Sequence, residues 1–199
     1  LATTLGSFVG QVTDSPVQKV EILFDGHVSE MNTKALSSAA LAGLLRPQVA
    51  DVNMVSAPLM ASERGMQLTE MTRSKSGVFD GYIKITVTTE QNVRSVGGTV
   101  FSDGKPRFIQ IKGINIDAEI GKDMLYTTNR DVPGIIGTLG QTLGENGVNI
   151  ANFTLGRAAE GGDAIALLYV DGKLSPKALD ALSETGLFNQ VKPLSFDID

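Results

Sequence analysis

The chain has 199 residues, of which 42% are apolar, and a formal charge of -5 at pH 7. This length predicts two domains of about 100 residues, each large enough to bury a core. The negative charge and the scattered basic residues argue against a nucleic-acid partner. Because no run of apolar residues is long enough to cross a bilayer, we expect no membrane partner either.

Cysteine is absent from the sequence, and His27 is its single histidine. This composition excludes disulfides, thiolate nucleophiles and metal sites that need two or more histidines. We therefore expect neither catalytic residues nor metal ligands in the chain, and we interpret His27 as a surface or turn residue. Because no leader resembling a signal peptide is present, we expect a cytoplasmic protein, or one of the plastid stroma if the source is a plant.

The first half of the chain predicts a mixed domain of helices and strands. Residues 1–12 place Leu5, Phe8 and Val12 on one side of a helix, which we interpret as the tail of a helix from a missing catalytic portion. Apolar spacing and turn residues then predict strand, helix, strand and helix, at residues 17–24, 34–45, 49–55 and 59–64. Beta-rich runs separated by glycine turns predict antiparallel strands, at residues 82–89, 95–101 and 108–116. We assign residues 13–121 to this domain.

The second half predicts the order βαββαβ, which is that of a ferredoxin-like fold. Alternating apolar residues predict four strands, at residues 123–128, 149–155, 164–170 and 191–196. Helical spacing predicts the two helices, at residues 132–145 and 177–182. We assign residues 122–199 to this second domain, and the fold class of the whole chain is α+β.

The loop between the first strand and the first helix of this second domain carries polar and glycine residues. Pro133 suits a helix start, Gly134 allows close approach, and helix N-terminal amides favour a ligand carboxylate. Asn129 and Asp131 can bind an ammonium or hydroxyl group, and we expect Asn149 to face the same loop from the next strand. These groups suit a free amino acid. The alternative is that Asp131 only caps the helix and Asn149 only satisfies a turn.

Two runs in this region resemble a known family. The letters NRDVPGIIG at residues 129–137 and LGENGVNIANFTLGR at residues 143–157 resemble the ACT domain of D-3-phosphoglycerate dehydrogenases. Upstream, PLMASERG at residues 58–65, RSVGGTV at 94–100 and PRF at 106–108 resemble the intervening, or allosteric substrate-binding, domain of the long form. The resemblance spans nearly the whole chain.

This resemblance implies a regulatory region of an enzyme that oxidises 3-phosphoglycerate with NAD in the first step of L-serine biosynthesis. The cofactor NAD would bind a missing N-terminal catalytic domain, because this chain has no Gly-x-Gly-x-x-Gly turn after a strand. ACT domains of the family pair between subunits in a homo-oligomer and bind L-serine, or a similar small amino acid, as feedback inhibitor. The resemblance places the effector site at Asn129, Asp131, Pro133, Gly134, Asn149 and Ile150.

Some relatives carry an anion site in the intervening domain, and Arg107 matches one of its basic positions. Glu119 and Tyr169 stand where basic partners are expected, so Arg107 has the alternative interpretation of a solvated strand residue. Two other functions stay open for the whole chain. It could serve oligomerisation alone, without an effector, or it could be a lyase or deaminase with an iron-sulfur cluster, which the absence of cysteine disfavours.

Overall fold

The computed structural model describes residues 1–74 and 77–197. The chain divides into two compact units, Leu1–Gly113 and Ile114–Asp199. The predicted domains 13–121 and 122–199 include residues 75–76 and 198–199, which lie outside the described residues. Each unit combines helices with a sheet, which confirms the α+β prediction.

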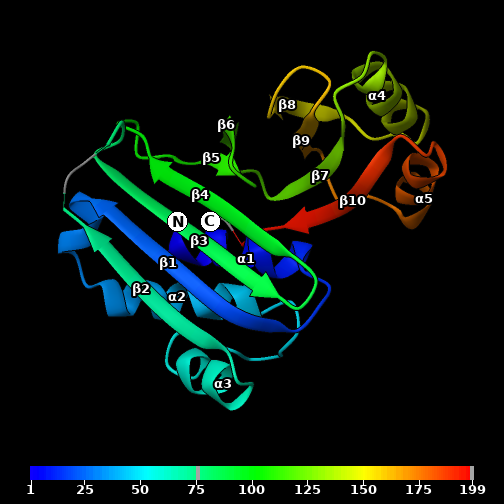
Figure 1. Cartoon of the computed structure of the whole chain (residues 1–199). Coiled ribbons are helices and arrows are strands. Elements are labelled where there is room, and N and C mark those ends of the chain that lie inside the picture. Colours follow the sequence, from blue (N-terminus) through cyan, green and yellow to red (C-terminus); the bar gives the residue numbers. More distant parts are fainter. Residues whose placement is uncertain (75–76, 198–199) are drawn as a thin grey trace. The chain divides into compact units, whose positions relative to one another are not determined.

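The first unit is a sheet covered by helices. Its helical segments are α1 (Ala2–Val12), η1 (His27–Glu30), α2 (Thr33–Leu45) and α3 (Ala57–Glu63). Its strands are β1 (Val17–Gly26), β2 (Gln67–Arg73), β3 (Gly81–Thr89), β4 (Val93–Val100) and β5 (Pro106–Ile111). The strands lie in the order β2-β1-β3-β4-β5 (Figure 1), with β2 parallel to β1 and the other neighbours antiparallel.

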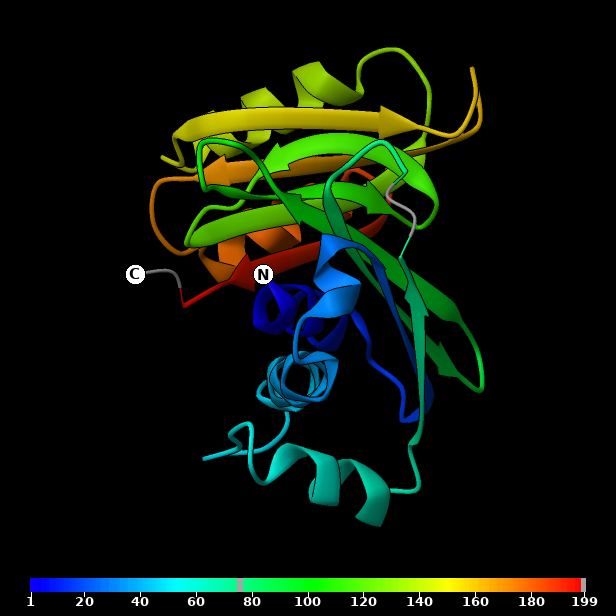
Figure 2. The ribbon, with the colours of Figure 1, turned by 90° about the vertical axis from the view of Figure 1, so that its left-hand side faces the viewer.

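Helices α1 and α2 lie together on one face of this sheet (Figure 2). The predicted apolar side of α1 is buried, with Phe8 1% exposed and Leu5 fully covered. The two helices approach closely because α1 carries Gly6 and Gly10 where it meets α2. A Cβ atom at Gly6 would lie only 2.0 Å from the carbonyl oxygen of Ala40. Gly6 and Gly10 therefore determine how closely α1 can approach α2.

The predicted strand at residues 49–55 is wrong. This segment forms turns, in which the Asn53 side chain accepts hydrogen bonds from the amides of Val55 and Ser56. The strand that follows is β2, and the sequence did not predict it. All its residues are exposed, so it shows no alternation of apolar and polar positions. The parallel pairing of β2 with β1 holds it at the sheet edge.

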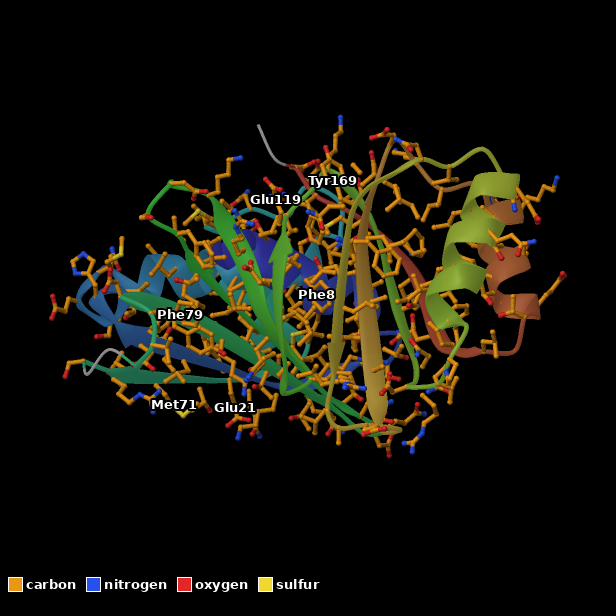
Figure 3. All side chains as sticks on the ribbon, turned by 90° about the horizontal axis from the view of Figure 1, so that it is seen from above. Phe8, Glu21, Met71, Phe79, Glu119 and Tyr169 are labelled. Atoms are coloured by element: carbon orange, nitrogen blue, oxygen red, sulfur yellow. The ribbon has the colours of Figure 1, made fainter. Side chains whose placement is uncertain are left out.

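After an additional first strand, the second unit has the predicted βαββαβ order. Its elements are β6 (Ile114–Glu119), β7 (Asp123–Arg130), α4 (Ile135–Glu145), β8 (Ile150–Arg157), β9 (Asp163–Val170), α5 (Pro176–Glu184) and β10 (Phe188–Ser195). The four-stranded sheet has the antiparallel order β10-β7-β9-β8. Figure 3 shows α4 and α5 next to each other beside these strands. They bury a core that includes Leu125, Leu139, Leu143 and Leu168.

Strand β6 lies against β8 at a glycine. A Cβ atom at Gly156 would lie 2.6 Å from the Cγ2 atom of Ile116 and 2.9 Å from the carbonyl oxygen of Asn115. Since Leu155 and Arg157 face the start of α4, Gly156 between them points to the opposite face of the sheet. No helix within residues 1–74 or 77–197 is long and apolar enough to cross a membrane.

Candidate functional site

A pocket of about 410 Å³ lies in the second unit, where β7 ends and α4 begins. It is formed by residues 129 and 131–137, residues 155–157 of β8 and Ala164 of β9. Four of the predicted effector residues line it: Asn129, Asp131, Pro133 and Gly134. A volume in this range suits a small molecule.

Asn129 supplies an amide to the pocket wall. It lies near the end of β7, opposite Ala164 of β9 and Phe188 of β10, and its side chain is 3% exposed. The side-chain nitrogen donates a hydrogen bond of 2.6 Å to the carbonyl oxygen of Arg130. The flanking strands and this hydrogen bond therefore hold the Asn129 side-chain amide in one position.

Asp131 supplies a carboxylate. Its Oδ2 atom accepts a hydrogen bond of 2.8 Å from Nη1 of Arg157 and a longer one, 3.3 Å, from the amide of Gly161. The Arg157 guanidinium is the main cause that lowers the pKa of Asp131 below the usual aspartate value, and the Gly161 amide adds to it. Asp131 is therefore ionised at neutral pH.

The start of α4 differs from the prediction. The helix begins at Ile135, three residues later than Val132, because Pro133 lies in a turn and Gly134 is the N-cap with a φ of 94°. No side chain caps this end, so the interpretation of Asp131 as the helix cap is wrong. The first amides of a helix have no partner within the helix. The amides of Ile135, Ile136 and Gly137 can therefore bind an anion in the pocket.

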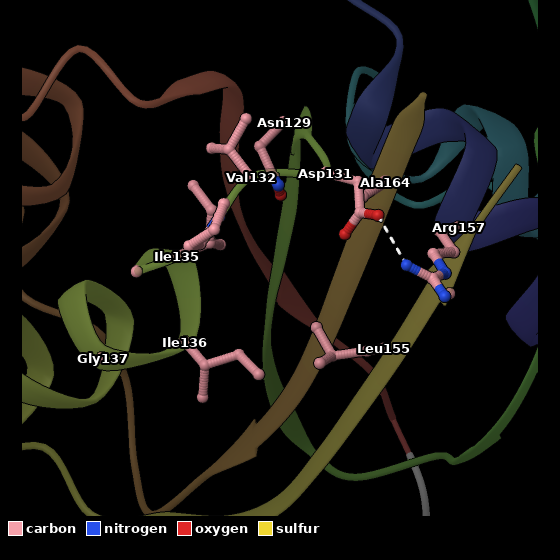
Figure 4. A pocket seen from close by; sticks show the side chains of 12 residues that line it. Asn129, Asp131, Val132, Ile135, Ile136, Gly137, Leu155, Arg157 and Ala164 are labelled. Carbon is pink, nitrogen blue, oxygen red and sulfur yellow. Dashed lines mark hydrogen bonds and ion pairs between the residues drawn. The ribbon is translucent and has the colours of Figure 1, made fainter. Parts of the chain in front are cut away.

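Apolar side chains complete the pocket. Figure 4 shows Ile136 of α4 and Leu155 of β8 on opposite sides of it. They are 55% and 45% exposed, and Val132 of the loop is similarly exposed. Such open apolar surface is available to a ligand or to another polypeptide.

The structure does not bring Asn149 and Ile150 to this pocket within one chain. Helix α4 has 11 residues and is about 16 Å long, so the chain enters β8 at the other end of the sheet. There Ile150 pairs with Val170 and packs against the core, and the Asn149 side chain donates to Oδ2 of Asp171 at 2.6 Å. The expectation that Asn149 faces the Asp131 loop is thus wrong for a single chain.

Sequence reasoning missed Arg157, although the residue lies within a run that it singled out. The available signal was the period of two in a strand, which puts Arg157 on the same side of β8 as Leu155. Register with β9 places Arg157 opposite Ala164, at the pocket end of the sheet. Only the pairing of β8 with β9 shows that this end meets the Asp131 loop.

Arg107 belongs to the first unit and has local partners. Its Nη2 atom lies 3.5 Å from Oδ2 of Asp103, and its guanidinium carbon lies 5.1 Å from the ring centre of Phe101. Glu119 and Tyr169, both labelled in Figure 3, belong to the second unit, where the Tyr169 ring covers Gly121. The anion site stays a prediction.

His27 is exposed and lies 3.7 Å from a carboxylate oxygen of Glu30. Within the described part of the chain, no group of three or more histidine, cysteine, aspartate or glutamate side chains is placed to hold a metal ion. The α4 pocket, in contrast, combines a carboxylate, a guanidinium and the uncapped start of a helix.

The second unit is thus a ferredoxin-like α+β domain with a pocket of small-molecule size. Residues 1–112 match the family model described as the D-3-phosphoglycerate dehydrogenase intervening domain. Since the match covers more than half of the 199 residues, the chain belongs to this family.

Relatives match most of the chain. It is 34% identical to the D-3-phosphoglycerate dehydrogenase of Bacillus subtilis over 92% of its length, which is 35% of that enzyme. The enzymes of Synechocystis and Methanocaldococcus jannaschii are 33% and 31% identical, again over 92% of this chain. The chain therefore spans about a third of the length of these relatives.

Proposed function

We propose that this chain is a regulatory region of a D-3-phosphoglycerate dehydrogenase and that its α4 pocket binds a small neutral amino acid, with L-serine the first candidate. The observation that carries the proposal is the pocket itself, in which the ionised Asp131 and the uncapped start of α4 line the same space. A carboxylate acceptor and a set of backbone donors match the two charged ends of an amino acid.

The ligand lies with its ammonium group at Asp131 and its carboxylate at the amides of Ile135 to Gly137. Asn129 is the polar group available to a hydroxyl on the ligand side chain. Among the residues that line the pocket, one acid and one base carry charge, Asp131 and Arg157. Their charges cancel, and this balance favours a zwitterion over a ligand with a net charge.

A second copy of the chain completes the site. Asn149 lies at the far end of its own sheet, so only another copy can bring this side chain to the Asp131 loop. The exposed Val132, Ile136 and Leu155 beside the pocket give such a copy an apolar surface to cover. The pocket of about 410 Å³ is also larger than serine requires, which leaves room for a side chain from the partner.

The remaining two thirds of the parent enzyme supply NAD binding and the oxidation of 3-phosphoglycerate. Serine then regulates the enzyme by binding more tightly to one arrangement of the subunits than to another. In this scheme, the chain itself carries no catalytic residue.

Calorimetric titration of the 199-residue chain with L-serine tests the proposal. Ethanolamine, which lacks the carboxylate, and D-glycerate, which lacks the amine, serve as ligand controls. Loss of a hydrogen bond to a charged group costs roughly tenfold or more in affinity, so we expect Asp131→Asn to weaken L-serine binding by about that factor. Asp163→Asn is the matched control, since Asp163 also pairs with an arginine, Arg130, but does not line the pocket.

Saturable binding of L-serine alone supports the proposal, and equal binding of L-serine to the Asp131→Asn and Asp163→Asn variants contradicts it. A second candidate function is oligomerisation without an effector, which the exposed apolar side chains around the pocket favour. It predicts a stable dimer whose mass in sedimentation equilibrium and melting temperature are the same with and without L-serine.

A further inference from the structure

Arg157 connects two sides of the amino-acid pocket. It extends from the last residue of β8 and contacts Asp131, which lies in the loop after β7 (Figure 4). Register with Ala164 of β9 fixes the backbone from which the arginine extends. Both Asp131 and Arg157 line the pocket, so the ion pair is part of the wall that a ligand meets.

The hydrogen bonds to the Asp131 carboxylate all go to one of its two oxygens, Oδ2, so that Oδ1 stays available to a ligand. Oδ2 receives Nη1 of Arg157 and the amide of Gly161, both on the side of the β8–β9 hairpin. The backbone amide of Asp131 also donates to Gly162 in that hairpin, at 2.8 Å. In Figure 4, the dashed line joins Oδ2 to Arg157, while the other carboxylate oxygen, Oδ1, points away from the arginine.

We infer that Arg157 is a positioning residue of the amino-acid site, which holds Asp131 by Oδ2 so that Oδ1 stays turned toward the ligand ammonium. This inference rests on the proposed function and adds to it a residue that acts through Asp131. The hairpin backbone alone cannot hold the Asp131 carboxylate in this orientation. Gly161 offers it a single amide at 3.3 Å, which is near the limit for a hydrogen bond.

Arg157 has a second effect, on the pH range in which the ligand binds. An ammonium group is bound well only by the ionised carboxylate, and a neighbouring guanidinium keeps a carboxyl group ionised to lower pH. Removing the guanidinium moves the protonation of Asp131 to higher pH, so binding is lost at a higher pH as the solution is acidified.

The opposite role for Arg157 is competition, in which its guanidinium occupies the carboxylate that the ligand needs. The two roles differ in sign. A competitor lowers affinity, so its removal tightens binding, whereas a positioning residue raises affinity, so its removal weakens binding. The geometry favours positioning, because the arginine contacts one of the two carboxylate oxygens only.

Two measurements on the 199-residue chain test the inference, with Arg157→Gln, Arg157→Lys and Arg130→Gln as variants. Arg130 is the matched control, because it forms an exposed ion pair with Asp163 at 3.2 Å near the same hairpin but does not line the pocket. The first measurement follows the carboxyl carbon of Asp131 by NMR as a function of pH without ligand. The second is the affinity for L-serine over the same pH range.

We expect Arg157→Gln to raise the titration midpoint of Asp131, to weaken L-serine binding roughly tenfold at neutral pH and to move the loss of binding to higher pH. Arg157→Lys keeps the charge but not the planar fork, so its values fall in between. Arg130→Gln leaves both measurements unchanged. A residue needed only for folding would change the affinity without moving the pH profile.

The inference is overturned if Arg157→Gln binds L-serine as tightly as the unsubstituted chain, or more tightly, with the same pH profile. In that case L-serine still binds and the proposed function stands. If no variant and not even the unsubstituted chain binds L-serine, the proposed function fails, and the ligand-free titration still decides whether Arg157 controls Asp131.

Discussion

Alanine at Gly6 tests the packing of α1 on α2. The new Cβ atom would lie 2.0 Å from the carbonyl oxygen of Ala40, whereas Cβ atoms in proteins come no closer than about 3.0 Å to other heavy atoms. The helices must therefore separate by at least about 1 Å. Because the obstacle is backbone, no side-chain rotation can relieve the overlap, and Leu5 and Phe8 of α1 move away from the core with the helix.

The expected change in the free energy of unfolding combines a destabilising overlap with a stabilising gain in helix propensity. Overpacking of this kind costs about 3 kcal/mol, and the higher helix propensity of alanine returns roughly 1 kcal/mol. The free energy of unfolding of the first unit should fall by about 2 kcal/mol, which lowers its melting temperature by about 10 °C for a domain of this size. Gly140 of α4 is the matched control, because nothing lies within 4 Å of its added Cβ atom. Gly140→Ala should stabilise the second unit by about 0.5–1 kcal/mol.

The assay is thermal unfolding followed by NMR amide signals that are assigned to each unit separately. A melting temperature of the first unit that stays within about 2 °C of its original value in Gly6→Ala would refute the close helix contact. Destabilisation by Gly140→Ala as well would show that the effect does not come from the α1–α2 contact.

Three further changes test other parts of the structure. Asp25 is buried beside Arg73, and the hydrogen bond from Arg73 lowers the pKa of Asp25. This ion pair therefore stabilises the fold at pH values above the pKa of an unfolded aspartate, near 3.9. The stabilisation is lost as pH falls from the unfolded value through the lower folded value. Asp25→Asn should therefore reduce the melting temperature at pH 7, and this reduction should shrink steadily as the pH falls below about 3.9; a reduction that is the same at every pH would contradict the ion pair. Gly156→Val should destabilise the second unit by about 3 kcal/mol in urea unfolding, because β6 leaves no space for the side chain; a neutral effect would show that β6 does not lie there. Asn149→Ala should weaken L-serine binding at least about tenfold, while Asn152→Ala in the adjoining strand β8 does not; equal affinities would exclude Asn149 from the site.

Periodicity predicted most of the fold because most elements have one buried side. The helix α4 shows this clearly, since Ile135, Leu139 and Leu143 recur at helical spacing and all are buried. Strand β2 escaped prediction for the opposite reason, as none of its side chains is buried and only backbone pairing with β1 defines it. The apolar residues at 49–55 suggested a strand, but local hydrogen bonds of Asn53 favour turns.

Part of the lining of the α4 pocket could be predicted from the sequence. Asn129, Asp131, Pro133 and Gly134 are neighbours in sequence, so one loop suffices to bring them together. The partner of Asp131 is Arg157, 26 residues later, and only the strand order reveals that contact. The same strand order separates Asn149 from the loop, although the two are closer in sequence.

The most direct test of amino-acid binding at the α4 pocket is a titration of the isotope-labelled chain with L-serine, followed by the NMR signals of its backbone amides. We predict saturable shifts that are largest for Ile135, Ile136, Gly137 and Asp131, accompanied by a shift at Asn149 from a second copy. Saturable shifts that leave these amides unchanged, or no shifts at millimolar L-serine, would contradict the proposed site.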